Sequence, residues 1–295
     1  MKVLTVTNRK GGVGKTTQSR TLCEYFSVVR KMRVLAIDLD SQCSLSHLLL
    51  DMDMSQIGEQ GTRPPIHPTY DPHDPDLEDW DGRTSSADIF WGNEVFPYQA
   101  KYPDGAETLD ILPANKELLT DVEEQDQPAL QAQVIERLRE FVNLDDVQAA
   151  YDIAIVDTGP GASPLAKAAL RACTHVLIPI EVEPQCVRGL YEMITEIRQE
   201  DMRRDVDTRV EIVGIQPNRF KIRRALHKGL LDRVQQEFEG RVSPVILPDL
   251  VGFAERDADM AVPRSLFQLP PSDKARKAAV EFCEFVEARM FGEAP

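Results

Sequence analysis

A glycine-rich run with two lysines and two threonines lies near the start of the chain, and its residues are suited to phosphate chemistry. The run is Lys10, Gly11, Gly12, Val13, Gly14, Lys15, Thr16 and Thr17, between an apolar run and a segment expected to be helical. Glycines let consecutive backbone N–H groups converge on phosphate oxygens, and the N-terminus of the following helix favours negative charge. Lys15 is placed to reach β- and γ-phosphates, and the Thr16 hydroxyl to bind Mg²⁺. The run therefore predicts a nucleotide site.

Short strand-like runs that recur between helical patterns must position this loop. They are Lys2 to Thr7, Arg33 to Asp38, Thr108 to Leu112, Asp152 to Asp157, His175 to Ile180, Val210 to Ile215 and Val242 to Leu247. Runs such as VLAID, IAIVD and HVLIPI are apolar nearly throughout, as expected of parallel strands covered on both faces. This alternation predicts an α/β, doubly wound, mostly parallel sheet with helices on both faces.

The stretch from Asp51 to about Trp80 departs from this pattern. It carries Pro64, Pro65, Pro68, Pro72 and Pro75 among Asp, His and Gly residues. Such a stretch cannot continue a helix or a central strand. We expect one P-loop domain over residues 1–295, with a Pro/Asp-rich surface insertion at about 51–80 near the nucleotide site. A passive loop is the alternative interpretation of this insertion.

The charge and cysteine content limit the possible partners. The 295 residues include 34 Lys and Arg against 49 Asp and Glu, a net charge of −15, so the average surface repels nucleic acid and anionic lipid. Any DNA contact would need a local basic patch. The five cysteines have no CxxC spacing, which suits reduced cytosolic thiols. No apolar stretch approaches the ~20 residues of a membrane span, so we expect a soluble intracellular protein.

The glycine-rich run also departs from the usual P-loop pattern in a specific way. Arg9 stands where that pattern has glycine, and Lys10 supplies a second lysine. This KGGVGKTT form resembles the deviant Walker A motif of the ParA/MinD family of ATPases. In that family the early lysine crosses the dimer interface and contacts the partner's ATP. The resemblance therefore implies an ATP-bound homodimer and this cross-subunit role for Lys10.

Two carboxylate motifs fall where the family places them. The run from Ile37 to Gln42 resembles the family's DxDPQ element, with Ser41 in place of proline. By that resemblance Asp40 orients the attacking water and Asp38 supports the metal region. The run from Ile155 to Pro160 resembles the Walker B stretch, with Gly159 replacing the first proline. Asp157 would then hold the Mg²⁺ shell through water.

The resemblance covers most of the chain outside the insertion. The segment from Glu183 to Leu190 looks like the ParA segment after the fifth strand, and Leu247 to Pro263 resembles the family's late IPR…P region. Pro248 and Asp249 thereby join the expected nucleotide contacts. No NKxD guanine-reading motif occurs, so ATP is favoured over GTP. Asn218 is the candidate adenine contact, by its position in similar proteins.

A basic run interrupts the otherwise acidic sequence after Asn218. Its cations are Arg219, Lys221, Arg223, Arg224 and Lys228, beside a helical apolar stripe formed by Ile222, Leu226, Leu230, Val234 and Phe238. Clustered Lys and Arg can neutralise DNA phosphates without reading sequence. In ParA-like proteins the corresponding region contributes to nonspecific DNA binding, and Arg188 is a weaker addition. The alternative is a solvated helix face that pairs with acidic neighbours.

The residues and the resemblance together favour a partition ATPase of the ParA (Soj-like) type. It would be cytoplasmic and nucleoid-associated, and would position plasmid, chromosome, conjugative element or protein organelle. The acidic surface favours a ParB-like adaptor with a basic terminus.

Two other classes of protein are alternatives to the partition ATPase. A MinD-like membrane-surface regulator is one, but the C-terminal helix after Ser272 is expected to bury Ala275, Ala279, Phe282 and Val286 and to expose Glu281, Glu284 and Glu287. A nitrogenase-iron-protein-like reductase is the other, and it would need interfacial cysteines that are not evident.

Overall fold

The sheet of the computed structural model has the predicted parallel, doubly wound arrangement. The model describes residues 1–54, 62–74, 80–101, 105–220, 225–258 and 265–292. Within them the strands are β1 (Lys2–Val6), β2 (Val34–Leu39), β3 (Tyr98–Gln99), β4 (Leu109–Leu112), β5 (Ile153–Thr158), β6 (His175–Glu181) and β7 (Glu211–Asn218). They form one sheet in the order β3-β4-β2-β5-β1-β6-β7, in which β3 pairs antiparallel with β4 and the other pairs are parallel.

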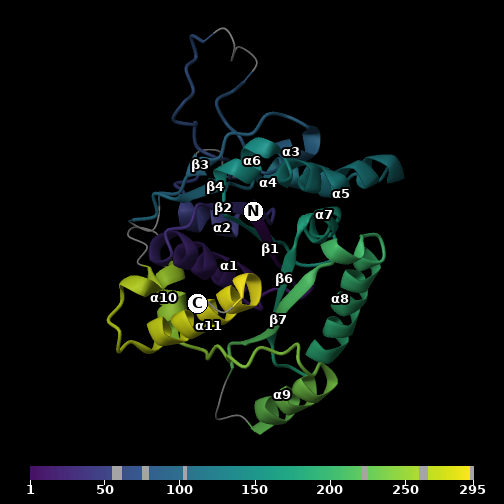
Figure 1. Ribbon diagram of the computed structural model, residues 1–295. Coiled ribbons are helices and arrows are strands. Elements are labelled where there is room, and N and C mark those ends of the chain that lie inside the picture. Colours follow the sequence, from purple (N-terminus) through teal and green to yellow (C-terminus); the bar gives the residue numbers. More distant parts are fainter. Residues whose placement is uncertain (55–61, 75–79, 102–104, 221–224, 259–264, 293–295) are drawn as a thin grey trace.

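Helices cover both faces of this sheet (Figure 1). The described α-helices are α1 (Lys15–Glu24), α2 (Ser44–Leu49), α3 (Asp88–Trp91), α4 (Lys116–Glu123), α5 (Pro128–Val142), α6 (Asp145–Ala150), α7 (Pro164–Ala172), α8 (Cys186–Asp201), α9 (Ala225–Glu237), α10 (Val251–Ala258) and α11 (Lys274–Phe291). A π-helical turn over Tyr25–Val29 and short 3₁₀ turns over Val206–Thr208 and Leu266–Gln268 complete the set.

Alternate residues of the central strands enter two separate apolar clusters. On β1, Val3 belongs to the cluster that contains residues of α5, α7 and α8, whereas Leu4 belongs to the cluster with residues of α1, α2 and α11. Leu35 and Ala36 divide in the same way on β2. Because successive side chains of a strand point to opposite faces, both faces of the sheet are buried. The prediction from the continuous apolar runs is confirmed.

The expected strand from Val242 to Leu247 is wrong as a regular strand. The segment runs beside β7, where Ser243 N–H donates to Ile215 O at 2.8 Å and Leu247 N–H to Pro217 O at 3.0 Å, but the residue pairs form only isolated bridges. Pro244 has no N–H to add to a ladder. The Gln216 side chain donates instead to Val245 O at 2.8 Å. The segment is therefore extended but irregular, and the two-residue strand β3 was not predicted.

The C-terminal helix α11 packs its apolar face into the core. Ala275, Ala279, Phe282 and Val286 are buried, as expected, although Asp273 rather than Ser272 caps the helix by accepting from Ala275 N–H at 2.7 Å. Glu281 and Glu284 are exposed.

The expectation that Glu287 lies on the exposed face of α11 is wrong. Glu287 is partly buried, since it accepts a 2.7 Å hydrogen bond from the Tyr25 hydroxyl and pairs with Arg30. Within the described ranges, no helix combines the length and apolar character needed to cross a bilayer.

The described part of the 51–80 insertion packs around an aromatic cluster. The His67 ring lies 4.7 Å from the ring of Tyr98 and 5.9 Å from that of Trp80, and Trp80 lies 4.7 Å from Phe96. The Tyr98 hydroxyl donates to Pro65 O at 2.8 Å. The insertion is thereby attached to the β3 edge of the sheet (Figure 1). Residues 55–61 and 75–79 lie outside the described part of the chain.

A buried ionic network joins α1 to α10. The Arg20 side chain on α1 is 0% exposed and pairs with Glu24 at 2.8 Å and with Asp257 of α10 at 3.2 Å. Arg256 donates to the Thr21 hydroxyl at 2.9 Å, and the Ser265 hydroxyl donates to Glu24 at 2.9 Å. Since buried charges need partners, this network holds α10 at a fixed place on α1.

We expect Arg20→Ala to lower the free energy of unfolding by about 3 kcal/mol, because the buried Glu24 carboxylate would lose its 2.8 Å partner and keep only Arg256, 3.8 Å away, as a cation. Urea denaturation of the full chain measures this change. The control is Arg137→Ala, whose pair with Glu140 is largely exposed and should contribute less than about 1 kcal/mol. Equal stability of the two variants would show that the buried network does not stabilise the fold.

Candidate nucleotide-binding site

The loop between β1 and α1 has a backbone that requires glycine. Gly12 and Gly14 have φ angles of 75° and 90°, a region that residues with a Cβ rarely adopt. At Gly14 a Cβ would also lie 2.1 Å from Nδ2 of Asn218. Asn218 reaches the loop from the end of β7 and donates to Val13 O at 2.8 Å. The structure thus gives the glycine-rich run the strand–loop–helix context of a P-loop.

Lys15 begins α1 and is buried at the base of the loop. The residue is 6% exposed, and its Nζ donates to Lys10 O at 3.3 Å. Burial lowers the pKa of the Lys15 ammonium, whereas the charges of Asp157 and Asp40 raise it. The loop therefore holds a desolvated cation at the place where a phosphate would meet the helix N-terminus.

Two buried carboxylates lie side by side beneath the loop. Asp38 on β2 is in register with Asp157 on β5. Asp38 Oδ2 accepts from Ser46 N–H at 2.9 Å and from the Ser46 hydroxyl at 2.7 Å, and Asp157 Oδ1 accepts from the Ser19 hydroxyl at 2.9 Å. In the described residues Asp157 Oδ2 has no hydrogen-bond partner. This arrangement leaves one carboxylate oxygen available to a cation or its water shell.

The two carboxylates are costly to ionise together. Burial, and next the charge of Asp38, raise the pKa of Asp157 to about 8. Burial raises the pKa of Asp38 to about 6. A divalent cation between Thr16 and these groups would relieve their repulsion. The residues present thus fit a magnesium ion.

Asp40 lies at the end of β2 and is half-buried. Its N–H donates to Asp38 Oδ1 at 3.1 Å, and its own Oδ1 accepts from Gln42 N–H at 3.0 Å. A Cβ on Gly159 would lie 3.4 Å from that same Oδ1. Gly159, which replaces the proline usual in the family, therefore borders Asp40 closely.

Lys10 points away from Lys15 in the single chain. Its side chain is 42% exposed, forms an ion pair with Glu183, and lies 3.8 Å from Glu181 at the end of β6. The neighbouring Arg9 pairs with Glu192 at 3.0 Å and Glu196 at 2.6 Å on α8. The outer part of the loop, formed by Arg9 and Lys10, is thus attached to α8 and β6 by charge pairs.

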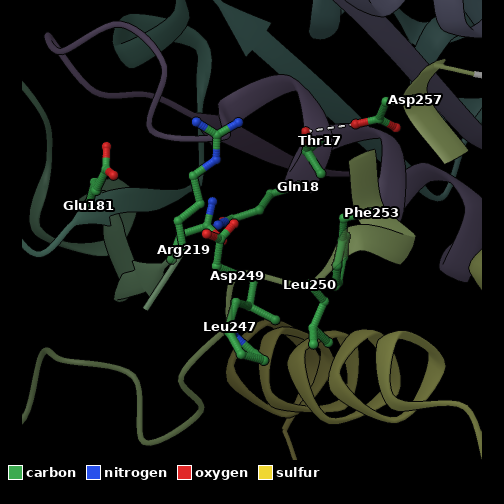
Figure 2. Close-up of a pocket in the computed structure, with 11 residues that line it drawn as sticks. Thr17, Gln18, Glu181, Arg219, Leu247, Asp249, Leu250, Phe253 and Asp257 are labelled. Atoms are coloured by element: carbon green, nitrogen blue, oxygen red, sulfur yellow. Dashed lines mark hydrogen bonds between the residues drawn. The ribbon is translucent and has the colours of Figure 1, made fainter. Parts of the chain in front are cut away.

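A pocket of about 500 Å³ opens beside the P-loop (Figure 2). Its lining includes the expected residues Thr17, Asn218, Pro248 and Asp249. Leu247, the first residue of the expected late motif, also lines it, and so do residues that the sequence did not single out, namely Gln18, Glu181, Leu250, Phe253 and Asp257. No local motif identifies them, because they meet only through the packing of α1, β6, β7 and α10.

The expected DNA-binding residues that the structure describes belong to separate elements, with Arg188 on α8, Arg219 after β7 and Lys228 on α9. Arg219 has a positive φ of 51°, lines the pocket and donates to Gly12 O at 2.9 Å. The Arg188 side chain is 89% exposed and pairs with Glu192 at 3.2 Å, while Lys228 is exposed on α9. Lys221, Arg223 and Arg224 lie outside the described residues, as does Ile222 of the apolar stripe.

Comparison with known proteins agrees with this site. Residues 1–212 match a family model described as an AAA domain. The sporulation initiation inhibitor protein Soj of Bacillus subtilis (strain 168) is 26% identical over 256 residues, which cover 86% of this chain and 87% of Soj. The chromosome partitioning protein ParA of Caulobacter vibrioides (strain NA1000 / CB15N) is 26% identical over 255 residues, 86% of this chain and 83% of that protein.

A solved structure shares the whole fold. The ATP complex of a McdA variant from Cyanothece has a TM-score of 0.74 at 16% identity, and the match covers 100% of this chain and 98% of that chain. The family match includes the P-loop, Asp38, Asp40 and Asp157. The chain therefore belongs to this AAA-domain family, among its ParA-like ATPases.

Proposed function

We propose that this chain is an ATP-dependent switch of the ParA type, which dimerises on ATP, binds nonspecific DNA and positions DNA or another cargo. The observation that carries the proposal is the buried Lys15 at a glycine loop, beside the Asp38 and Asp157 carboxylates and an open pocket. The partition proteins among its relatives support the biological role. The packing of α11 against α1 supports one domain over residues 1–295, with 51–80 inserted in it.

The P-loop would hold the phosphates of ATP. Backbone N–H groups from Gly11 to Thr17 would donate to the phosphates, and Lys15 would neutralise the β- and γ-oxygens. Thr16 would bind Mg²⁺ directly, with Asp38 and Asp157 behind its water shell. The ion would supply positive charge to the phosphate oxygens during hydrolysis to ADP and phosphate.

Asp40 and Lys10 would control hydrolysis and dimerisation. The half-buried Asp40 carboxylate is held by the backbone of Gln42 and can orient a water toward the γ-phosphate. Lys10 would leave Glu181 and Glu183 to contact the partner subunit's ATP. Hydrolysis would remove that contact and release the dimer.

The DNA surface and the adaptor follow from charge. Lys221, Arg223, Arg224 and Lys228, with Arg188 and Arg219 as further cations, would contact DNA phosphates when two chains join. An acidic chain would attract a Lys/Arg-rich terminus of a ParB-like adaptor, whose cation would stabilise the transition state. The protein would then be cytoplasmic, associated with the nucleoid and independent of membranes.

Lys15→Ala and Lys10→Ala should separate nucleotide binding from dimerisation. Lys15→Ala should weaken ATP binding by about 30-fold or more, because phosphate charge is left unmatched in a desolvated loop. Lys10→Ala should bind ATP normally but not dimerise, because its ammonium acts on the partner's nucleotide. Calorimetry with Mg·ATP measures ATP binding, and light scattering measures dimerisation. Lys277→Ala, on the exposed face of α11, is the control for both. Normal ATP-dependent dimers of Lys10→Ala would exclude the cross-subunit role.

Asp40→Ala should slow steady-state ATP turnover by about 100-fold while leaving ATP-bound dimers intact, since the water loses its orienting carboxylate. Phosphate release and dimer lifetime on DNA are the measurements. Asp145→Ala, on the exposed end of α6, is the matched control. Unchanged turnover would show that another residue orients the attacking water.

Arg223→Ala with Arg224→Ala should weaken ATP-dependent binding to every DNA sequence alike, and should reduce the salt-dependence slope by about 1.8. Arg219→Ala should weaken ATP binding as well as DNA binding, because Arg219 also lines the pocket. Arg233→Ala, an exposed residue of α9 paired with Glu237, is the control. A double variant with the wild-type slope would place the DNA surface elsewhere.

A further inference from the structure

Gln18 is buried beside the nucleotide pocket with its amide unpaired. It lies on the first turn of α1, where its N–H donates to Gly14 O at 3.1 Å, and the residue is 2% exposed. Neither Nε2 nor Oε1 has a hydrogen-bond partner among the described residues. A buried amide without partners destabilises a fold, so a helix-interior leucine would suit this position better if Gln18 served packing alone.

The surroundings of Gln18 suit a flat, partly apolar ligand. Figure 2 shows its side chain extending from α1 toward Arg219 and Asp249, in a pocket that Leu247, Leu250 and Phe253 line from the other side. Lys15, the phosphate-facing residue, lies three positions earlier on the same helix. A nucleotide whose phosphates lie on the loop would therefore place its base near Gln18 and these apolar walls.

Other polar side chains of the pocket already have protein partners. Asn218 donates its amide to Val13 O at 2.8 Å and so braces the P-loop. The Thr17 hydroxyl donates to Asp257 at 2.9 Å. Gln18 differs from both, because within the described part of the chain neither its donor nor its acceptor has a partner.

We propose that Gln18 reads the adenine base and makes the site selective for adenine over guanine, an inference that rests on the proposed function. Its Nε2 would donate to N7 of adenine while Oε1 accepts from the 6-amino group. This is the bidentate pattern that an amide makes with adenine. Guanine places a carbonyl oxygen where adenine has the amino group, so Oε1 would face a second acceptor. Gln18 is thus a specificity-determining residue that no phosphate-binding motif reveals.

The test compares the wild-type chain with Gln18→Leu, which keeps the size of the side chain and removes both polar atoms. Calorimetry measures the affinity for Mg²⁺ complexes of ADP, GDP and purine riboside diphosphate, which lacks the 6-amino group; diphosphates avoid turnover. Gln18→Leu should bind ADP about 5- to 150-fold more weakly and GDP nearly as the wild type does. Loss of the 6-amino group should weaken binding to the wild type by about 5-fold or more, but to Gln18→Leu by less than about 2-fold.

Thermal unfolding without nucleotide separates base reading from a structural role. Gln18→Leu should unfold at the wild-type midpoint or above it, because an unpaired amide has been removed. Gln199→Leu, exposed on α8, should change neither affinity nor midpoint. An unchanged ratio of ADP to GDP affinity in Gln18→Leu would overturn the inference, as would an equal loss for both nucleotides with a lowered midpoint. A wild-type chain that binds neither ADP nor ATP would contradict the proposed function itself.

Discussion

The site depends on the enclosure of like charges at the ends of adjacent parallel strands. The register of β2 and β5 fixes Asp38 opposite Asp157, and the β1 loop brings Lys15 to the same buried region. One lysine cannot fully compensate two neighbouring carboxylates, and one oxygen of Asp157 has no hydrogen-bond partner among the residues that the structure describes. A cation and phosphate oxygens would complete the charge pairing of such a region and stabilise it, which supports the proposed nucleotide site.

The pocket itself is assembled from segments far apart in the sequence. Thr17 on α1 bonds Asp257 on α10, and the Arg20 and Glu24 pair below them is sealed from solvent. On the other side of the pocket Asn218 packs so closely against Gly14 that no side chain larger than a hydrogen atom fits there. The loop that would bind phosphates and the wall that would bind the base are therefore held by one set of contacts around α1. Movement of α10 cannot occur without disturbing the nucleotide site.

The sequence predicted the parts of this site whose chemistry is local. A run of glycines with a lysine and a threonine identifies a phosphate loop before the fold is known, and the structure then gives two of these glycines positive φ angles. Unbroken apolar runs identify buried parallel strands in the same way. Parts that depend on packing were missed or wrong. Proline in the 242–247 segment breaks a ladder that its apolar residues suggested. Gln18 resembles any polar residue of a helix until its neighbours are known, and the place of Arg219 follows from the longer course of β7.

Arg9 donates three hydrogen bonds to carboxylates of α8 whereas Lys10 donates one to Glu183, and this difference suits the proposed switch. Arg9 is held by two carboxylates of α8 and keeps the loop in place. Lys10 makes exposed pairs with Glu181 and Glu183, and exposed pairs contribute little, typically up to about 1 kcal/mol. A phosphate group in a water-excluded interface offers an ammonium far more than a solvated carboxylate does. We therefore expect the Lys10 side chain to exchange its carboxylate partners for phosphate when a dimer forms. Arg9 would meanwhile hold the rest of the loop against α8.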